Sequence, residues 1–178
     1  MAMAYAFGQV AHRDGDGVPD FDLDSSEGRQ QYAQWIWENR GRFGIEVPDG
    51  TSFGYIDEFI MITQVGRVVC DGPCPNIDYQ RRIPMAGEYF SGDGGGLIRM
   101  YRGAFDPWQS ATIQVPGGSN PRIIGNLNMT PSGSTAWALG HEAAHARGVD
   151  LNVGIYPHLQ AEYHGYQAFR QYRSLRER

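Results

Sequence analysis

Residues 138–146 read Ala138-Leu139-Gly140-His141-Glu142-Ala143-Ala144-His145-Ala146, and this stretch decides the fold of the chain. Most of its residues are strong helix formers. Upstream serines are typical N-cap residues, and Gly148 is a typical helix stop. The sequence therefore predicts a helix from about Ser132 or Ser134 to Arg147.

On that helix, His141 and His145 stand four residues apart and share one face, so their imidazoles can chelate one metal ion. Zinc is the expected metal, because it prefers nitrogen, sulfur or carboxylate ligands in a tetrahedron. Glu142 is angled away from the metal and can act as a general base on water that zinc activates. The alternative interpretation is two ordinary histidines on a helix face, without a metal.

A catalytic zinc needs a third protein ligand, and four downstream residues are candidates. We predict Glu162, because it falls on the apolar stripe of a final helix, where a metal would offset the cost of burying a carboxylate. His158 shares that face and is expected to contact substrate or support a ligand. Asp150 can orient a ligand histidine, and His164 is expected to be solvated. Alternatively, Glu162 is a partly exposed residue paired with an arginine.

The text around the HExxH motif resembles the active-site helix of the zincin metallopeptidases. Ala161-Glu162-Tyr163-His164 resembles the glutamate helix of the gluzincins, and the resemblance spans about Thr130 to Arg173. Leu151 stands where the metzincin pattern requires a third histidine, which argues against that subgroup. The resemblance implies a zincin-like α+β fold and a zinc-dependent hydrolase that cleaves peptide bonds. It assigns zinc binding to His141, His145 and Glu162, and catalysis to Glu142.

The chain is also similar in size to bacterial effector peptidases and polymorphic-toxin tips, which implies a protein or peptide substrate and an immunity protein as partner. All 15 basic residues are arginine. A GC-rich genome explains this composition, and so does delivery into a foreign cell. No signal peptide is visible at the start, so the localisation stays open between these expectations.

The length of 178 residues predicts a single domain with one core. We expect an acidic loop and helix over 1–44, a strand-rich part over 45–129, and zinc-binding helices over 130–178. Asp24 and Glu27 form a capping box for the first helix, which should end at Gly41. The last helix should begin at about His158. This arrangement predicts the α+β class, with a small antiparallel or mixed sheet.

Short strands are predicted in the middle of the chain, at Ile56–Val69, Gly96–Arg102, Ala111–Val115 and Arg122–Met129. Zincins hold substrate as an added strand on a sheet edge, and either of the last two ranges can supply that edge. Side chains that can stabilise an oxyanion are Tyr156, Tyr163, Tyr166 and Arg147.

Two further features leave alternatives open. Aspartates alternate around glycine in Asp14–Asp24, which suits either a calcium loop or a solvated turn. Cys70 and Cys74 can form one disulfide or remain free thiols. A non-catalytic calcium-binding interaction module is therefore one competing function, and a zinc amidase acting on cell-wall crosslinks is another.

The bulk properties exclude two other classes of function. The net charge of −5 argues against a broad nucleic-acid surface. No run of about 18 apolar residues is present, so we predict no membrane span.

Overall fold

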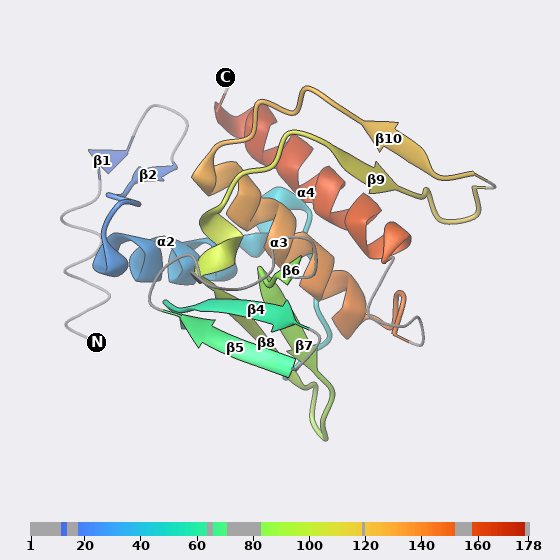
Figure 1. Cartoon of the computed structure of the whole chain (residues 1–178), viewed down its shortest axis with the longest axis horizontal. Helices are drawn as coiled ribbons and strands as arrows, with labels where there is room; N and C mark the ends of the chain where they lie inside the picture. Colours follow the sequence, from blue (N-terminus) through green and yellow to red (C-terminus); the bar gives the residue numbers. More distant parts are fainter. Residues whose placement is uncertain are drawn as a thin grey trace.

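The computed structural model describes residues 12–13, 18–63, 66–70, 83–118, 120–151 and 158–176. Over these residues the protein is α+β, as predicted, with a small mixed sheet and three α-helices (Figure 1). The helices are α2 (Ser26–Glu38), α3 (Pro131–Ala146) and α4 (Leu159–Arg176). Two 3₁₀ helices, η1 and η3, cover Arg40–Phe43 and Arg102–Phe105.

The strands form four small sheets in the described part of the chain. The mixed sheet has the order β3-β8-β7, with β8 parallel to β3 and antiparallel to β7. Antiparallel pairing builds the other three, which have the orders β5-β4-β6, β10-β9 and β1-β2. The strand bounds are β1 His12–Arg13, β2 Pro19–Asp20, β3 Ser52–Ile56, β4 Phe59–Thr63, β5 Gly66–Cys70, β6 Ile83–Pro84, β7 Gly87–Phe90, β8 Leu97–Tyr101, β9 Ala111–Ile113 and β10 Arg122–Ile124.

Helix α3 lies at the centre of the molecule, with α4 on one side and strands β7 and β8 on the other (Figure 1). It is buried nearly all round, as expected for a helix covered on both faces. Small residues let α4 approach closely. A Cβ placed on Gly140 would lie only 2.8 Å from the Cβ of Ala168 and 3.2 Å from the Cα of Gly165. This close approach brings the start of α4 over the last turns of α3.

The sequence predicted the end of α3 correctly but not its start. The predicted start at Ser132 or Ser134 is wrong, because Thr130 is the N-cap and accepts a hydrogen bond from the backbone N–H of Gly133 at 3.2 Å. Pro131 then occupies the first helical position, where its missing N–H costs nothing. The predicted stop is confirmed, since Gly148 takes a left-handed φ of 95° just beyond the helix.

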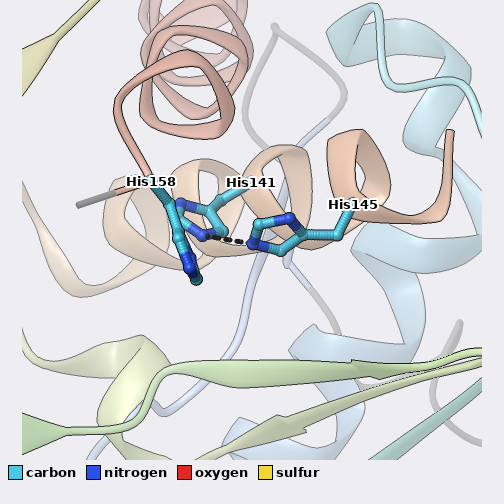
Figure 2. Close-up of side chains that lie close together, drawn as sticks. All are labelled: His141, His145 and His158. Atoms are coloured by element: carbon cyan, nitrogen blue, oxygen red, sulfur yellow. Dashed lines mark hydrogen bonds between the residues drawn. The ribbon is translucent and has the colours of Figure 1, made fainter. Parts of the chain in front are cut away.

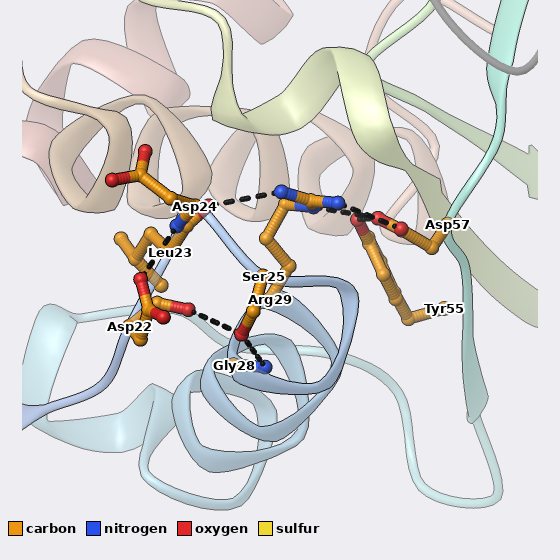
Figure 3. A network of polar contacts seen from close by, with 8 residues as sticks. All are labelled: Asp22, Leu23, Asp24, Ser25, Gly28, Arg29, Tyr55 and Asp57. Carbon is orange, nitrogen blue, oxygen red and sulfur yellow. Dashed lines mark hydrogen bonds and ion pairs between the residues drawn. The ribbon is translucent and has the colours of Figure 1, made fainter.

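Helix α2 begins one residue later than the capping box predicted. Ser25, rather than Asp24, is the N-cap, and its hydroxyl accepts from the backbone N–H of Gly28 at 2.9 Å (Figure 3). Its hydroxyl also donates to the carbonyl of Asp22. The helix ends at Glu38, before the predicted Gly41, because the chain tightens into η1 and leaves it through Gly44 at a φ of 69°.

The strand predictions were right in place and wrong in length. The range Ile56–Val69 is interrupted at Asp57, so it contains the end of β3 and the hairpin of β4 and β5. Arg29 of α2 holds Asp57 with two hydrogen bonds of 2.8 and 2.9 Å (Figure 3). This tertiary ion pair pins the chain where a strand would otherwise continue. The ranges for β8, β9 and β10 are confirmed, although each strand is shorter than predicted.

Three expectations lie outside what the structure describes. The calcium loop depends on the aspartates of 14–17, the disulfide depends on Cys74 and the side chain of Cys70, and one oxyanion candidate is Tyr156. Within the described ranges, no helix has the length and apolar character needed to cross a membrane.

Candidate metal centre

Three histidines meet where the end of α3 faces the start of α4 (Figure 2). His141 and His145 come from α3, and His158 immediately precedes α4. One ligand atom of each residue lies within 4.8 Å of those of the other two. The ring centroid of His145 is 4.7 Å from that of His141 and 4.7 Å from that of His158. The group has the residue type, number and spacing of a metal centre.

The two α3 histidines point the same ring atom toward the same place. Their Nε2 atoms lie 2.9 Å apart, and both Nδ1 atoms face away toward acceptors. His141 Nδ1 contacts the carboxylate of Glu162, and His145 Nδ1 lies 2.8 Å from the carbonyl oxygen of Val149. An acceptor at Nδ1 favours the tautomer in which Nδ1 carries the proton, which leaves the Nε2 lone pair for a metal.

The turn after α3 supplies one of these acceptors. Gly148 adopts its left-handed conformation and reverses the chain, so that the backbone N–H of Val149 returns to the carbonyl of Ala144 at 3.0 Å. The carbonyl of Val149 is thereby brought beside His145 Nδ1. The helix stop that is visible in the sequence therefore also orients a site residue.

A side-chain hydrogen bond from the turn after α3 fixes the start of α4. The Asp150 carboxylate accepts a hydrogen bond from the backbone N–H of Ala161 at 2.8 Å, which caps the first turn of α4 across the intervening chain. The backbone N–H of Glu162 bonds to the carbonyl of His158, so both side chains stand one turn apart on the face toward α3. His158 and Glu162 are therefore placed together, and Asp150 holds the turn that carries them.

The surroundings of the two α3 histidines shift their pKa values in opposite directions. Burial by itself would lower the pKa of His141, but the hydrogen bond to Glu162 and the nearby carboxylates outweigh it and raise the pKa. Burial and the neighbouring His141 lower the pKa of His145 to about 4. The two facing rings therefore differ in basicity, because carboxylates act on His141 while burial and the neighbouring imidazole act on His145.

Glu142 lies buried beside the group, with only 7% of its surface exposed. Burial raises its pKa to about 7; His141 opposes this rise, while the charges of Glu88 and Glu162 add to it. On its other side the strand β7 passes at Gly87, where an added Cβ would lie 3.0 Å from the Cγ of Glu142. The carboxyl is therefore confined between the helix and the edge of the mixed sheet.

The structure brings all four predicted site residues together, but it groups His158, rather than Glu162, with the ring nitrogens of His141 and His145. Glu162 contacts the Nδ1 edge of His141, whereas the Nε2 atom of that ring faces Nε2 of His145. His158, which the sequence suggested as a supporting residue, is instead the third member of the histidine group. Ligation by Glu162 remains a prediction, because the contact that the structure shows for it is that of a ligand's partner.

The remaining candidates have other contacts. His164 Nδ1 lies 3.3 Å from the guanidinium of Arg147, which also donates to the carbonyl of Glu46. Tyr166 packs on the indole of Trp137, and the ring of Tyr163 lies beside His164. An oxyanion role for Arg147 or these tyrosines stays a prediction.

Sequence reasoning missed Trp137, whose indole N–H donates to Glu162 at 3.0 Å. It also assigned His158 a supporting role, whereas the structure groups His158 with His141 and His145. The i, i+4 spacing of His158 and Glu162 was the available signal, since it places both on one helix face.

Comparison with known proteins returned no matching family model, no matching curated protein and no matching solved structure.

Proposed function

We propose that this protein is a zinc-dependent hydrolase that cleaves peptide bonds, with zinc bound by His141, His145 and His158 and with Glu142 as general base. The observation that carries the proposal is the convergence of the Nε2 atoms of two histidines, each held from behind at Nδ1, beside a third histidine. A buried carboxyl stands next to them in the sequence and in space.

The donor set fits a catalytic zinc. Three imidazoles satisfy three positions of a tetrahedron and leave the fourth for water or substrate, whereas structural zinc sites use four protein ligands. Imidazole also suits copper, iron and nickel, so the three histidines by themselves do not select zinc. The neighbouring glutamate, which suits a hydrolytic site, favours zinc among these metals. Carboxylate and carbonyl oxygens, which calcium and magnesium require, are not the atoms that converge here.

When bound, zinc would polarise the scissile carbonyl and acidify a water ligand. The protein's own contribution is the handling of the proton by Glu142. A carboxyl with a pKa near 7 is matched to accept a proton from water and return it to the leaving amine near neutral pH. The close approach of Gly87 to the Glu142 side chain limits the space in which the carboxyl can move, which favours a fixed position for the general base.

The arrangement of the sheets supports a proposal for where substrate binds. The ranges suggested by the sequence form β9 and β10, a two-stranded ribbon that packs on α4, with the N–H of Gln114 bonded to the carbonyl of Leu159. Strand β7 is one of the two outer strands of the mixed sheet in the described part of the chain, and it is the outer strand that passes beside Glu142 at Gly87. We therefore assign substrate to the edge of β7, as an added strand.

The test is hydrolysis by the zinc-loaded protein of a panel that contains unstructured proteins, a peptide library and cell-wall crosslink peptides. We expect cleavage of the first two, loss of cleavage with a chelator, and recovery on adding zinc. Glu142→Gln should keep zinc and reduce turnover by about 10²–10⁴-fold, since only the general base is lost. Near-normal turnover by this variant would exclude the mechanism.

The two competing functions give different results in the same experiment. Cleavage restricted to cell-wall crosslinks would support the amidase with the same machinery. A protein that cleaves nothing on the panel and responds to calcium alone would be the interaction module, and the hydrolase proposal would then be wrong.

A further inference from the structure

Glu162 has both carboxylate oxygens engaged between the two helices. Oε1 contacts Nδ1 of His141, and Oε2 accepts a hydrogen bond from the indole Nε1 of Trp137 at 3.0 Å. The side chain is 22% exposed, so it lies mostly within the α3–α4 interface. With one oxygen on each partner, the plane of the carboxylate is fixed by Trp137 as well as by the histidine.

Trp137 is rigidly held, which makes it suited to fix another group. It is 1% exposed and lies at the centre of an aromatic cluster. Trp108 meets it edge-on at 5.5 Å between ring centroids, while Tyr166 and Phe169 pack on it at 5.7 and 5.9 Å. An indole in such a cluster has one available orientation, and its N–H here points at Glu162.

Gly165 makes this contact possible. A Cβ at this position would lie 2.5 Å from Cδ1 and 2.6 Å from Nε1 of the Trp137 indole, distances that no real side chain tolerates. The absent side chain lets the indole lie against the backbone of α4, within reach of Glu162 three residues earlier. The residues are therefore connected in series: Gly165 makes room for the Trp137 indole, and the indole binds Glu162. Glu162 in turn contacts His141.

We propose that Trp137 is a positioning residue of the metal centre: its N–H orients Glu162, and Glu162 in turn holds Nδ1 of His141 so that Nε2 faces the metal. The inference rests on the proposed function, because it assumes that the histidines bind zinc. It assigns Glu162 to the support of a ligand. Partners of ligand histidines typically contribute about 10–100-fold to metal affinity.

The first test compares zinc affinities, measured by competition with a chromophoric chelator, for the wild-type protein and Trp137→Phe. The substitution keeps an aromatic ring and removes the N–H, and we expect zinc to bind about 10–100-fold more weakly. Trp108→Phe is the matched control, because Trp108 belongs to the same cluster and contacts Trp137 rather than the carboxylate. The control should bind zinc as the wild type does.

A double-mutant cycle separates this role from loss of packing. In Glu162→Gln, the amide must present its NH₂ either to the indole N–H or to His141 Nδ1, so two donors meet or the histidine changes tautomer. Trp137→Phe removes one of those donors. The zinc affinity of the double variant should therefore be within about threefold of that of Glu162→Gln alone. If the two substitutions acted independently, their losses of affinity would multiply instead.

A spectroscopic measurement on the unaltered chain covers the case in which a variant fails to fold. The indole N–H resonance of Trp137 should shift when zinc is added, and that of Trp108 should shift less. If the wild-type protein binds zinc but Trp137→Phe matches it, if the two substitutions multiply, or if the Trp137 resonance stays fixed, the positioning role is wrong and the hydrolase proposal stands. A wild-type protein that binds no zinc overturns both.

Discussion

Gly87 of β7 lies so close to Glu142 of α3 that a side chain at position 87 would contact the carboxyl stem of the glutamate. An added Cβ would be 3.0 Å from Glu142 Cγ, 3.1 Å from the carbonyl oxygen of Arg99 and 3.4 Å from Met100 Cγ. The backbone at Gly87 does not have a positive φ, so its glycine is explained by this close approach rather than by conformation. The strand therefore limits where the proposed general base can lie.

Gly87→Ala should lower kcat by about tenfold or more in protein that retains its zinc, because displacement of a reacting group by a fraction of an ångström is costly. Gly54→Ala is the matched control. Gly54 lies in β3 of the same sheet and has no atom within 4 Å of an added Cβ. Equal kcat values for the two variants would show that β7 does not confine Glu142.

Asp150 should matter for zinc binding, although it is not expected to touch the metal. Asp150→Ala removes the acceptor for the N–H of Ala161, which should destabilise the start of α4 by about 1 kcal/mol and weaken zinc binding through His158. Asp150→Asn keeps an acceptor oxygen and tolerates the left-handed φ of 56° at this position. In zinc titration and thermal unfolding, the zinc affinity and melting temperature of Asp150→Asn should be near the wild-type values. Both quantities should be clearly lower in Asp150→Ala. If the two variants lose equal zinc affinity and stability, the negative charge of Asp150 matters rather than its hydrogen bond to Ala161.

The pair of Arg29 and Asp57 predicts how stability depends on acid. Burial tends to raise the pKa of Asp57, but hydrogen bonds from Arg29 and Tyr55 hold it at about 2, below its ordinary 3.8. The side chains are only 7% and 15% exposed. The depressed pKa contributes about 2 kcal/mol above pH 4, and this contribution disappears as the pH falls toward 2.

Urea unfolding of the wild-type protein and Asp57→Asn between pH 7 and 3 measures that contribution. At pH 7 the variant should be less stable by at least about 2 kcal/mol, because Arg29 would also remain buried without a counter-ion. The difference should shrink by about 1 kcal/mol at pH 3. A difference that is constant across this range would contradict the assigned pKa.

Local patterns predicted the central helix and the final helix, because their determinants lie in adjacent residues. Helix formers and the Gly148 stop located α3, and the motif within it located His141, Glu142 and His145. The exact N-cap was not predictable from serine preference, since Pro131 moved the start to Thr130.

The features that could not be predicted depend on contacts between distant segments. The break at Asp57 is set by an arginine 28 residues away. The choice between His158 and Glu162 depends on how closely α4 approaches α3, and that distance is set by Gly140, Gly165 and Ala168. Helix periodicity placed Glu162 on the correct face, but only the helix–helix geometry shows which atom it meets.

Metal content after chelator-free purification and equilibration with zinc is the most direct test of whether His141, His145 and His158 bind zinc. We predict one zinc per chain in the wild-type protein, loss of most bound zinc in His158→Ala, and full retention in His164→Ala, whose ring contacts Arg147 instead. Glu162→Ala should keep zinc with weakened affinity. A wild-type protein without zinc would contradict the proposed metal centre, and so would a folded His158→Ala variant that holds zinc as tightly as the wild type.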